Sequence, residues 1–122
     1  MTLQIYADRK IAELESRVEG EARKTLESGH ADAIHDLRVS IRRLTQALRA
    51  FESLVGKQRA KQSRRRLRRW MDAAAEIRNR DIALELITAS GIEPDSAIAK
   101  RVIAEREAAH GRLAQLLAEK TS

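Results

Sequence analysis

The chain has 122 residues, of which 24 are Lys or Arg and 18 are Asp or Glu, with a formal net charge of +6 and no cysteine. This length suits one hydrophobic core, so we expect residues 1–122 to form a single domain. The lack of cysteine excludes a disulfide framework, thiolate metal ligands and a thiol nucleophile. No apolar run reaches the roughly 18 residues of a membrane helix, and the first residues do not resemble a signal peptide, so we expect a soluble, cytoplasmic protein without membrane contacts.

Apolar residues recur with the period of an α-helix along most of the chain, which has a single proline. The first predicted helix covers residues 3–27 and ends before Gly29. Its apolar side consists of Ala7, Ile11, Leu14, Val18 and Ala22. The second predicted helix covers residues 32–55, from Asp32 as its N-cap to Gly56 as its stop.

A third helical region is expected over residues 58–88, either continuous or bent or divided, with a core row of Leu67, Trp70, Ala74, Ile77 and Leu84. Asp81 falls in line with that row, so we expect its carboxylate to point inward, and we expect Trp70 to pack in the core. A fourth helix starts near residues 94–96 and buries Ile98, Val102, Ala109, Leu113 and Leu116. Four amphipathic helices joined by short loops predict an all-α fold, an antiparallel four-helix bundle.

The second predicted helix carries two stripes. Its apolar stripe consists of Ile34, Leu37, Ile41, Leu44, Leu48 and Phe51. A basic row, centred about 120° around the helix from the apolar stripe, consists of His35, Arg38, Arg42 and Arg49. Guanidinium groups match phosphate oxygens in shape and charge, so this basic row predicts a polyanionic ligand.

The positive charge is concentrated in one part of the chain. Residues 35–80 contain 14 Lys or Arg and four Asp or Glu, a net charge of +10, and the remainder has a net charge of −4. Such segregation steers anionic partners to one region. The alternative is an ordinary solvated face with ion pairs within the helices, but four carboxylates cannot neutralise fourteen cations.

Two segments resemble a known family, and the likeness covers roughly residues 1–118. The pattern His35-x-x-Arg38-Val39-x-x-Arg42-Arg43-Leu44 resembles the signature of the CHAD domain, the conserved histidine α-helical domain. Residues 77–84 are similar to the family's second block, in which an Arg-Asp pair, here Arg80-Asp81, is followed by an apolar residue and usually another Asp. Ala83 occupies that last place, so one expected acid is missing.

The resemblance implies a helical fold that binds inorganic polyphosphate through a basic surface and has no catalytic activity of its own. The family usually contains two similar four-helix halves with the binding surface at the centre, and this chain supplies one half. Because two-fold dimers are the commonest oligomers, we expect a homodimer to replace the missing half. An association with polyphosphate granules in the cytoplasm follows from the same resemblance.

On this interpretation, the polyphosphate-binding residues are His35, Arg38, Arg42, Arg43, Arg49, Arg64, Arg65, Arg68, Arg69 and Arg80. Asp81 would orient an arginine, Arg80 or Arg38, and would not be a catalyst. His35 is either a phosphate donor or a buried hydrogen-bonded histidine. The other histidines show no metal-ligand spacing, so we expect neither a metal nor another cofactor.

Two other function classes were weighed against polyphosphate binding. A helical protein that binds the nucleic-acid backbone would also use a basic row, although aromatic residues for base stacking are scarce. A phosphohydrolase or an accessory enzyme of polyphosphate synthesis would need a Gly-rich phosphate loop or clustered carboxylates for Mg²⁺, and the sequence has neither. We therefore expect a protein that is not an enzyme.

Overall fold

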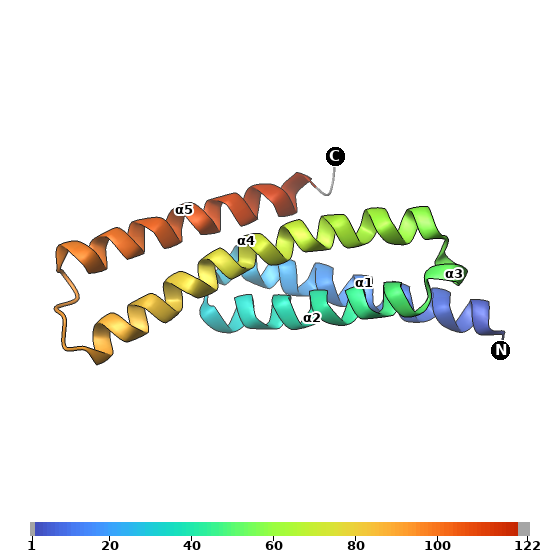
Figure 1. Ribbon diagram of the computed structural model, residues 1–122, viewed down its shortest axis with the longest axis horizontal. Helices are drawn as coiled ribbons and strands as arrows, with labels where there is room; N and C mark the ends of the chain where they lie inside the picture. Colours follow the sequence, from blue (N-terminus) through green and yellow to red (C-terminus); the bar gives the residue numbers. More distant parts are fainter. Residues whose placement is uncertain (1, 120–122) are drawn as a thin grey trace. The chain divides into compact units, whose positions relative to one another are not determined.

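The computed structural model describes residues 2–119, which form five α-helices and, within that range, no strand (Figure 1). The helices are α1 (Leu3–Ser28), α2 (Ala31–Ala50), α3 (Glu52–Val55), α4 (Lys57–Ala89) and α5 (Ala97–Glu119). The all-α prediction is confirmed. The chain divides into two compact units, Met1–Met71 and Asp72–Ser122, and the boundary falls inside α4.

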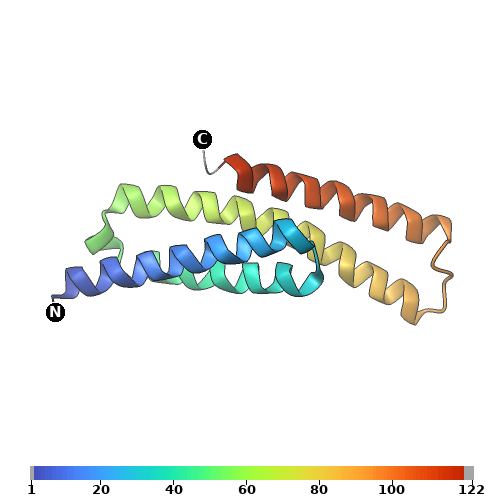
Figure 2. The same ribbon diagram turned by 180° about the vertical axis from the view of Figure 1, so that it is seen from behind.

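In the first unit, α1 and α2 form a helical hairpin and lie side by side with opposite directions (Figures 1 and 2). Gly29 ends α1 with φ 64°, a left-handed conformation that glycine adopts without a steric penalty, and its N–H donates to the carbonyl of Thr25. The predicted stop at Gly29 is confirmed. The N-cap prediction at Asp32 is wrong, because the N-cap of α2 is His30. Asp32 lies in the first turn, where the positive end of the helix dipole stabilises its carboxylate.

The predicted second helix does not run unbroken over residues 32–55. Phe51 has φ −104° and ψ 21°, and the chain leaves α2 there before one turn of α3. The Phe51 ring packs edge-on against Tyr6 of α1, with ring centroids 6.0 Å apart, and Gln4 Nε2 donates to the Leu54 carbonyl at 3.0 Å. Phe51 is therefore half-buried at the end of the hairpin, outside the fully buried stripe in which the sequence placed it.

The remaining apolar predictions for the first unit largely hold. Its buried hydrophobic residues are Ala7, Ile11, Val18, Ile34, Leu37, Ile41, Leu44, Leu48, Ala60, Leu67 and Trp70. Leu14 and Ala22 are only half-buried. Trp70 is 3% exposed, which confirms it as a packing residue. The buried hydroxyl of Ser40 donates to the Leu37 carbonyl at 2.7 Å, so this polar group costs little inside the unit.

The second unit contains the remainder of α4, from Asp72 onward, the connection at residues 90–96, and α5. The question of a bent or divided third helix is answered by α4, which is helical without interruption from Lys57 to Ala89. The buried residues of this unit are Ala74, Ile77, Ile87, Ala99, Ala109, Leu113 and Leu117. No helix within residues 2–119 is both long and apolar enough to cross a membrane.

The core prediction for the last helix is wrong at three positions, because Ile98 is exposed and Val102 and Leu116 are only half-buried. Ser96, the last residue of the predicted start at 94–96, caps α5 by accepting a hydrogen bond from the Ala99 N–H at 3.2 Å, and the helix begins at Ala97. The rotation of α5 buries Ala99 and leaves the Ile98 side chain exposed. At the other end Leu117 is buried, while Leu116 is half-buried.

A candidate polyanion-binding surface

The basic row of the sequence lies on one side of α2, as predicted. His35, Arg42 and Arg49 are exposed, and Arg38 is half-buried. At 100° per residue, the four positions fall within about 60° of one another. The rotation of α2 is fixed by the burial of its apolar stripe, so the direction of the basic row is set by the core and not by the flexibility of surface side chains.

Within residues 2–119, Arg42 and Arg49 have no carboxylate partner. In the part of the chain that the structure describes, neither of them makes an ion pair or a side-chain hydrogen bond. Their guanidinium groups point to solvent with all five N–H donors available to an external acceptor. The alternative of a face neutralised by ion pairs within the helix does not describe these two arginines.

The arginines of α4 that precede the unit boundary belong to the same compact unit as α2. Burial of Leu67 and Trp70 fixes the rotation of this part of α4. Two directions about 100° apart on α4 then divide these arginines, one with Arg64 and Arg68 and the other with Arg65 and Arg69. The four arginines therefore do not form the single wall that the sequence suggested. Two lysines that the sequence-based set lacks share the flank of Arg64 and Arg68, namely Lys57 and Lys61. The sequence could have predicted this flank, because Lys57, Lys61, Arg64 and Arg68 are spaced by four, three and four residues, as on one side of a helix.

Arg64 has a partner inside the unit. Its Nη2 lies 3.8 Å from Oε1 of Glu52 in α3, and both side chains are partly covered, at 24% and 35% exposed. An anion that binds Arg64 must therefore compete with the Glu52 carboxylate. Arg65 and Arg68 are exposed and, within residues 2–119, make no ion pair.

Arg43 lies on the opposite flank of α2 from the basic row. It lines a groove of about 450 Å³ between α1 and α2, together with Arg17, Glu21, His35, Asp36, Val39 and Ser40. The charges around this groove alternate in sign. Arg43 therefore faces a mixed environment, whereas His35 lies at the edge that the groove shares with the basic row.

In the second unit, Arg80 is held by two carboxylates. Its Nη1 lies 2.5 Å from Oε2 of Glu76, one turn earlier on α4, and its Nε lies 3.4 Å from Oε1 of Glu105 on α5. Glu105 also pairs with Arg101, at 3.5 Å. Arg80 is thus part of an internal ion-pair network, unlike Arg42 and Arg49.

The prediction that Asp81 orients Arg80 is wrong. Asp81 points inward as expected, with its side chain 19% exposed, but its Oδ1 accepts a 2.5 Å hydrogen bond from Nε of Arg106 on α5. Neighbouring residues on a helix point about 100° apart, so Arg80 and Asp81 reach different partners. The sequence carried a signal for Arg106, because it lies in register with the buried residues Ala99, Ala109 and Leu113 of the same helix.

Nearly the whole chain matches the model of one protein family. The CHAD domain model matches residues 7–122. The chain belongs to the CHAD domain family. This family is associated with polyphosphate binding in general. Comparisons with curated proteins and with solved structures gave no match.

The two segments that resemble the CHAD signature differ in whether their charged side chains form ion pairs. Residues 35–44 place exposed arginines on α2 in the first unit, whereas residues 77–84 place Arg80 and Asp81 in ion pairs with α5 in the second. Within residues 2–119, no group of three or more His, Cys, Asp or Glu side chains is placed to hold a metal ion. The feature of this CHAD domain best suited to an external ligand is therefore the cationic surface of the first unit.

Proposed function

We propose that this CHAD domain binds inorganic polyphosphate without cleaving or transferring its phosphoryl groups. The observation that carries the proposal is the exposed basic row of α2, in which Arg42 and Arg49 have no ion-pair partner within residues 2–119. Each Arg donates to phosphate oxygens through a planar fork. Because polyphosphate has no bases to stack or read, charge density and oxygen acceptors are the whole of its recognition chemistry.

The spacing along α2 suits a flexible polyanion. Arg38 and Arg42 are separated by a rise of about 6 Å along the helix axis, and Arg42 and Arg49 by about 10 Å. A flexible chain of phosphoryl units can place successive oxygens next to the arginines of the basic row. The release of counterions from the polyphosphate favours binding. His35 would add a donor at the end of the row.

The ligand would extend from α2 to cationic side chains of α4. Arg43, Arg64, Arg65, Arg68 and Arg69 remain in the proposed site of the first unit, and Lys57 and Lys61 join them. Arg80 of the second unit remains a separate candidate contact. We assign the largest contribution to side chains that no carboxylate neutralises, and smaller contributions to Arg64 and Arg80, which have internal partners.

The proposal extends to the assembly. The helices would pack as an antiparallel four-helix bundle that forms one half of the CHAD architecture, and a second copy of the chain would supply the other half. A dimer of this kind would dock on polyphosphate or carry a fused partner to polyphosphate-rich granules in the cytoplasm. Neither role needs a catalytic residue.

A competition experiment separates polyphosphate from nucleic acid, the other polyanion that a basic row can hold. Fluorescently labelled duplex DNA is bound to the protein, and long-chain polyphosphate is added at matched phosphate concentration. Polyphosphate should displace the DNA, and DNA should fail to displace labelled polyphosphate. Equal displacement in both directions would instead indicate a surface that binds any phosphate backbone.

A second experiment tests the absence of catalysis. The protein is incubated with polyphosphate and Mg²⁺ or Mn²⁺, and released orthophosphate and chain length are measured. We expect no shortening of the polymer at any protein concentration that binds it. Phosphate release that scales with protein and disappears in the Arg42→Gln variant would make this surface an active site.

A further inference from the structure

A stripe along α1 takes no part in the polyanion-binding surface described above, apart from Arg17, which lines the groove that Arg43 also lines. The residues of the stripe recur at spacings of four and three and are Tyr6, Lys10, Glu13, Arg17, Gly20, Lys24 and Glu27. This stripe lies about 120° around α1 from the buried Ala7, Ile11 and Val18, so it lies outside the core of the hairpin, and Arg17 borders the groove between α1 and α2. Such a heptad spacing is the pattern by which two helices meet along a seam.

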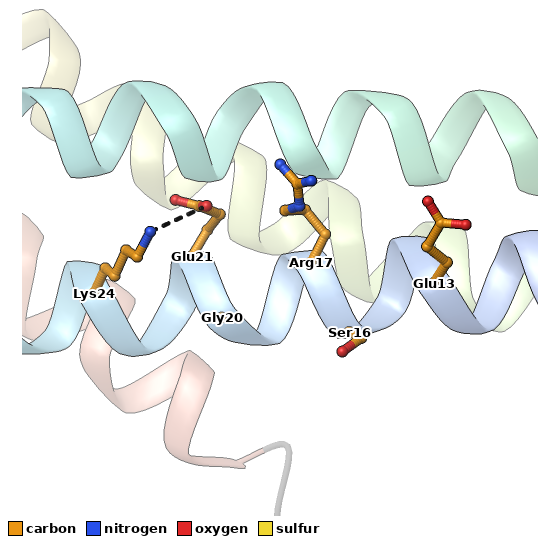
Figure 3. A pocket seen from close by; sticks show the side chains of 6 residues that line it. All are labelled: Glu13, Ser16, Arg17, Gly20, Glu21 and Lys24. Carbon is orange, nitrogen blue, oxygen red and sulfur yellow. Dashed lines mark ion pairs between the residues drawn. The ribbon is translucent and has the colours of Figure 1, made fainter.

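The middle of the stripe is hollow. A groove of about 360 Å³ is lined by Glu13, Ser16, Arg17, Gly20, Glu21 and Lys24, all on α1. Figure 3 shows these side chains along the helix, with Gly20 between the charged groups. Glycine weakens a helix, and a Cβ at position 20 would meet only the Nη2 of Arg23, at 4.0 Å. Packing inside the chain therefore does not require this glycine, whereas close approach of another molecule would.

The charges of the stripe complement themselves when the direction of the helix is reversed. If a two-fold axis passes midway between Arg17 and Gly20, Arg17 of one copy lies opposite Gly20 of the other. The same register places Glu13 opposite Lys24. One further turn outward, Lys10 lies opposite Glu27. Every charged pair in this arrangement joins opposite signs, and the two-fold axis makes each of them occur twice.

A buried carboxylate oxygen next to the groove lacks a donor. The side chain of Glu21 is 11% exposed, and its Oε2 is buried and has no hydrogen-bond partner within residues 2–119. Its other oxygen lies 3.7 Å from Nζ of Lys24, which is largely exposed. An unsatisfied buried carboxylate oxygen is costly, and a guanidinium that enters above Gly20 would supply donors to this carboxylate.

We propose that a second copy of the chain docks on this face, with the two α1 helices antiparallel and Arg17 of each copy seated over Gly20 beside Glu21 of the other. The inference rests on the second copy in the proposed function and names its surface. Self-complementary charge identifies the occupant as the same chain, since an unrelated partner would not need opposite signs at positions related by two-fold symmetry.

Charge reversal tests the register. Glu13→Lys places two lysines against each other twice per dimer, and Lys24→Glu does the same with two glutamates. Sedimentation velocity should give a dimer dissociation constant about 30-fold weaker for each variant, because two exposed pairs change from attraction to repulsion. An equimolar mixture of the two variants restores both pairs, so it should form a heterodimer with an affinity near that of the wild type.

A glycine substitution tests the close approach. Gly20→Gln should abolish dimerisation and at the same time raise the thermal stability of the helix. Gly111→Gln is the control, because Gly111 is likewise a helical glycine with open space around its Cβ position, although it is exposed and Gly20 is half-buried. It should raise stability and leave the dimer intact.

Three results would overturn the inference: a monomeric wild type, dimers that are indifferent to Glu13→Lys, or a mixture of the two charge variants that stays monomeric. Polyphosphate titration of the same samples separates this failure from failure of the proposed function. A monomer that still binds polyphosphate rejects only the α1 surface, and a dimer that does not bind polyphosphate rejects only the proposed function.

Discussion

Asp81 accepts a hydrogen bond from Arg106, with 2.5 Å between Oδ1 of Asp81 and Nε of Arg106. A second contact joins Nη2 of Arg106 to Oδ2 of Asp81 at 3.4 Å, so the carboxylate and the guanidinium face each other with both ends engaged. The two side chains are only 19% and 22% exposed. The pair ties α4 to α5 within the second unit, and it makes Asp81 a structural residue of this CHAD domain.

Asp81→Ala should lower the free energy of unfolding by about 1–3 kcal/mol, because it leaves a largely buried guanidinium without its carboxylate. Urea denaturation followed by circular dichroism measures the loss. Asp95→Ala, in the exposed connection before α5, is the control and should change stability by less than about 0.5 kcal/mol. If Asp81→Ala unfolds at the same urea concentration as the wild type, the pair does not hold the two helices together.

The double substitution Arg42→Gln and Arg49→Gln should weaken polyphosphate binding at least about tenfold and reduce the slope of log affinity against log salt by about 1–2, because two phosphate contacts are lost. Helicity should not change, since both side chains are exposed and unpaired in the described residues. Titration at several salt concentrations gives both quantities. Arg78→Gln with Arg112→Gln removes the same charge from exposed positions on α4 and α5, and an equal effect of that control would mean that only net charge matters.

Glu52→Gln should tighten polyphosphate binding about two- to threefold, because Arg64 loses the carboxylate that competes with the ligand. The comparison with Glu85→Gln, an exposed acid of the second unit, corrects for the change in net charge. In the Arg64→Gln background the benefit of Glu52→Gln should vanish. A benefit that persists there would show that Glu52 acts through the general field and not through Arg64.

His35→Ala should weaken polyphosphate binding about two- to threefold, because the exposed basic row loses a hydrogen-bond donor at its end. Titration of each variant with polyphosphate measures the change. His30→Ala, at the exposed turn between α1 and α2, is the control and should leave the affinity unchanged. An unchanged affinity in the His35→Ala variant would remove His35 from the binding surface.

Hydrophobic periodicity and helix-stop residues predicted most of the helices and buried residues of the first unit. The apolar stripe from Ile34 to Leu48 has the helical period and is buried throughout, and its burial fixes the direction of the basic row. Gly29 ended a helix because glycine alone adopts the left-handed conformation without strain. These features depend on residues close together in the sequence, and such features can be inferred without coordinates.

Features that depend on distant residues were missed. Residues 51–55 keep the helical period of the preceding segment, and the break at Phe51 coincides with contacts to Tyr6 and Gln4 on another helix. The rotation of α5 was predicted wrongly, because Ile98, Val102 and Leu116 also keep the helical period, whereas the buried row contains Ala99 and Leu117. The partner of Asp81 could have been found, because Arg106 is the charged member of an otherwise apolar row and an inward acid requires an inward base.

The exposed arginines of the first unit also determine how ions act on the free protein. Arg42 and Arg49, which have no carboxylate partner within residues 2–119, repel neighbouring cations, so unfavourable electrostatic repulsion remains in the folded state when no anion is bound. Added salt screens this repulsion and should raise the melting temperature of the free protein. The same screening should lower the affinity for a phosphate polymer. The ionic strength at which the free protein is most stable should thus be higher than the one at which the proposed ligand binds most tightly.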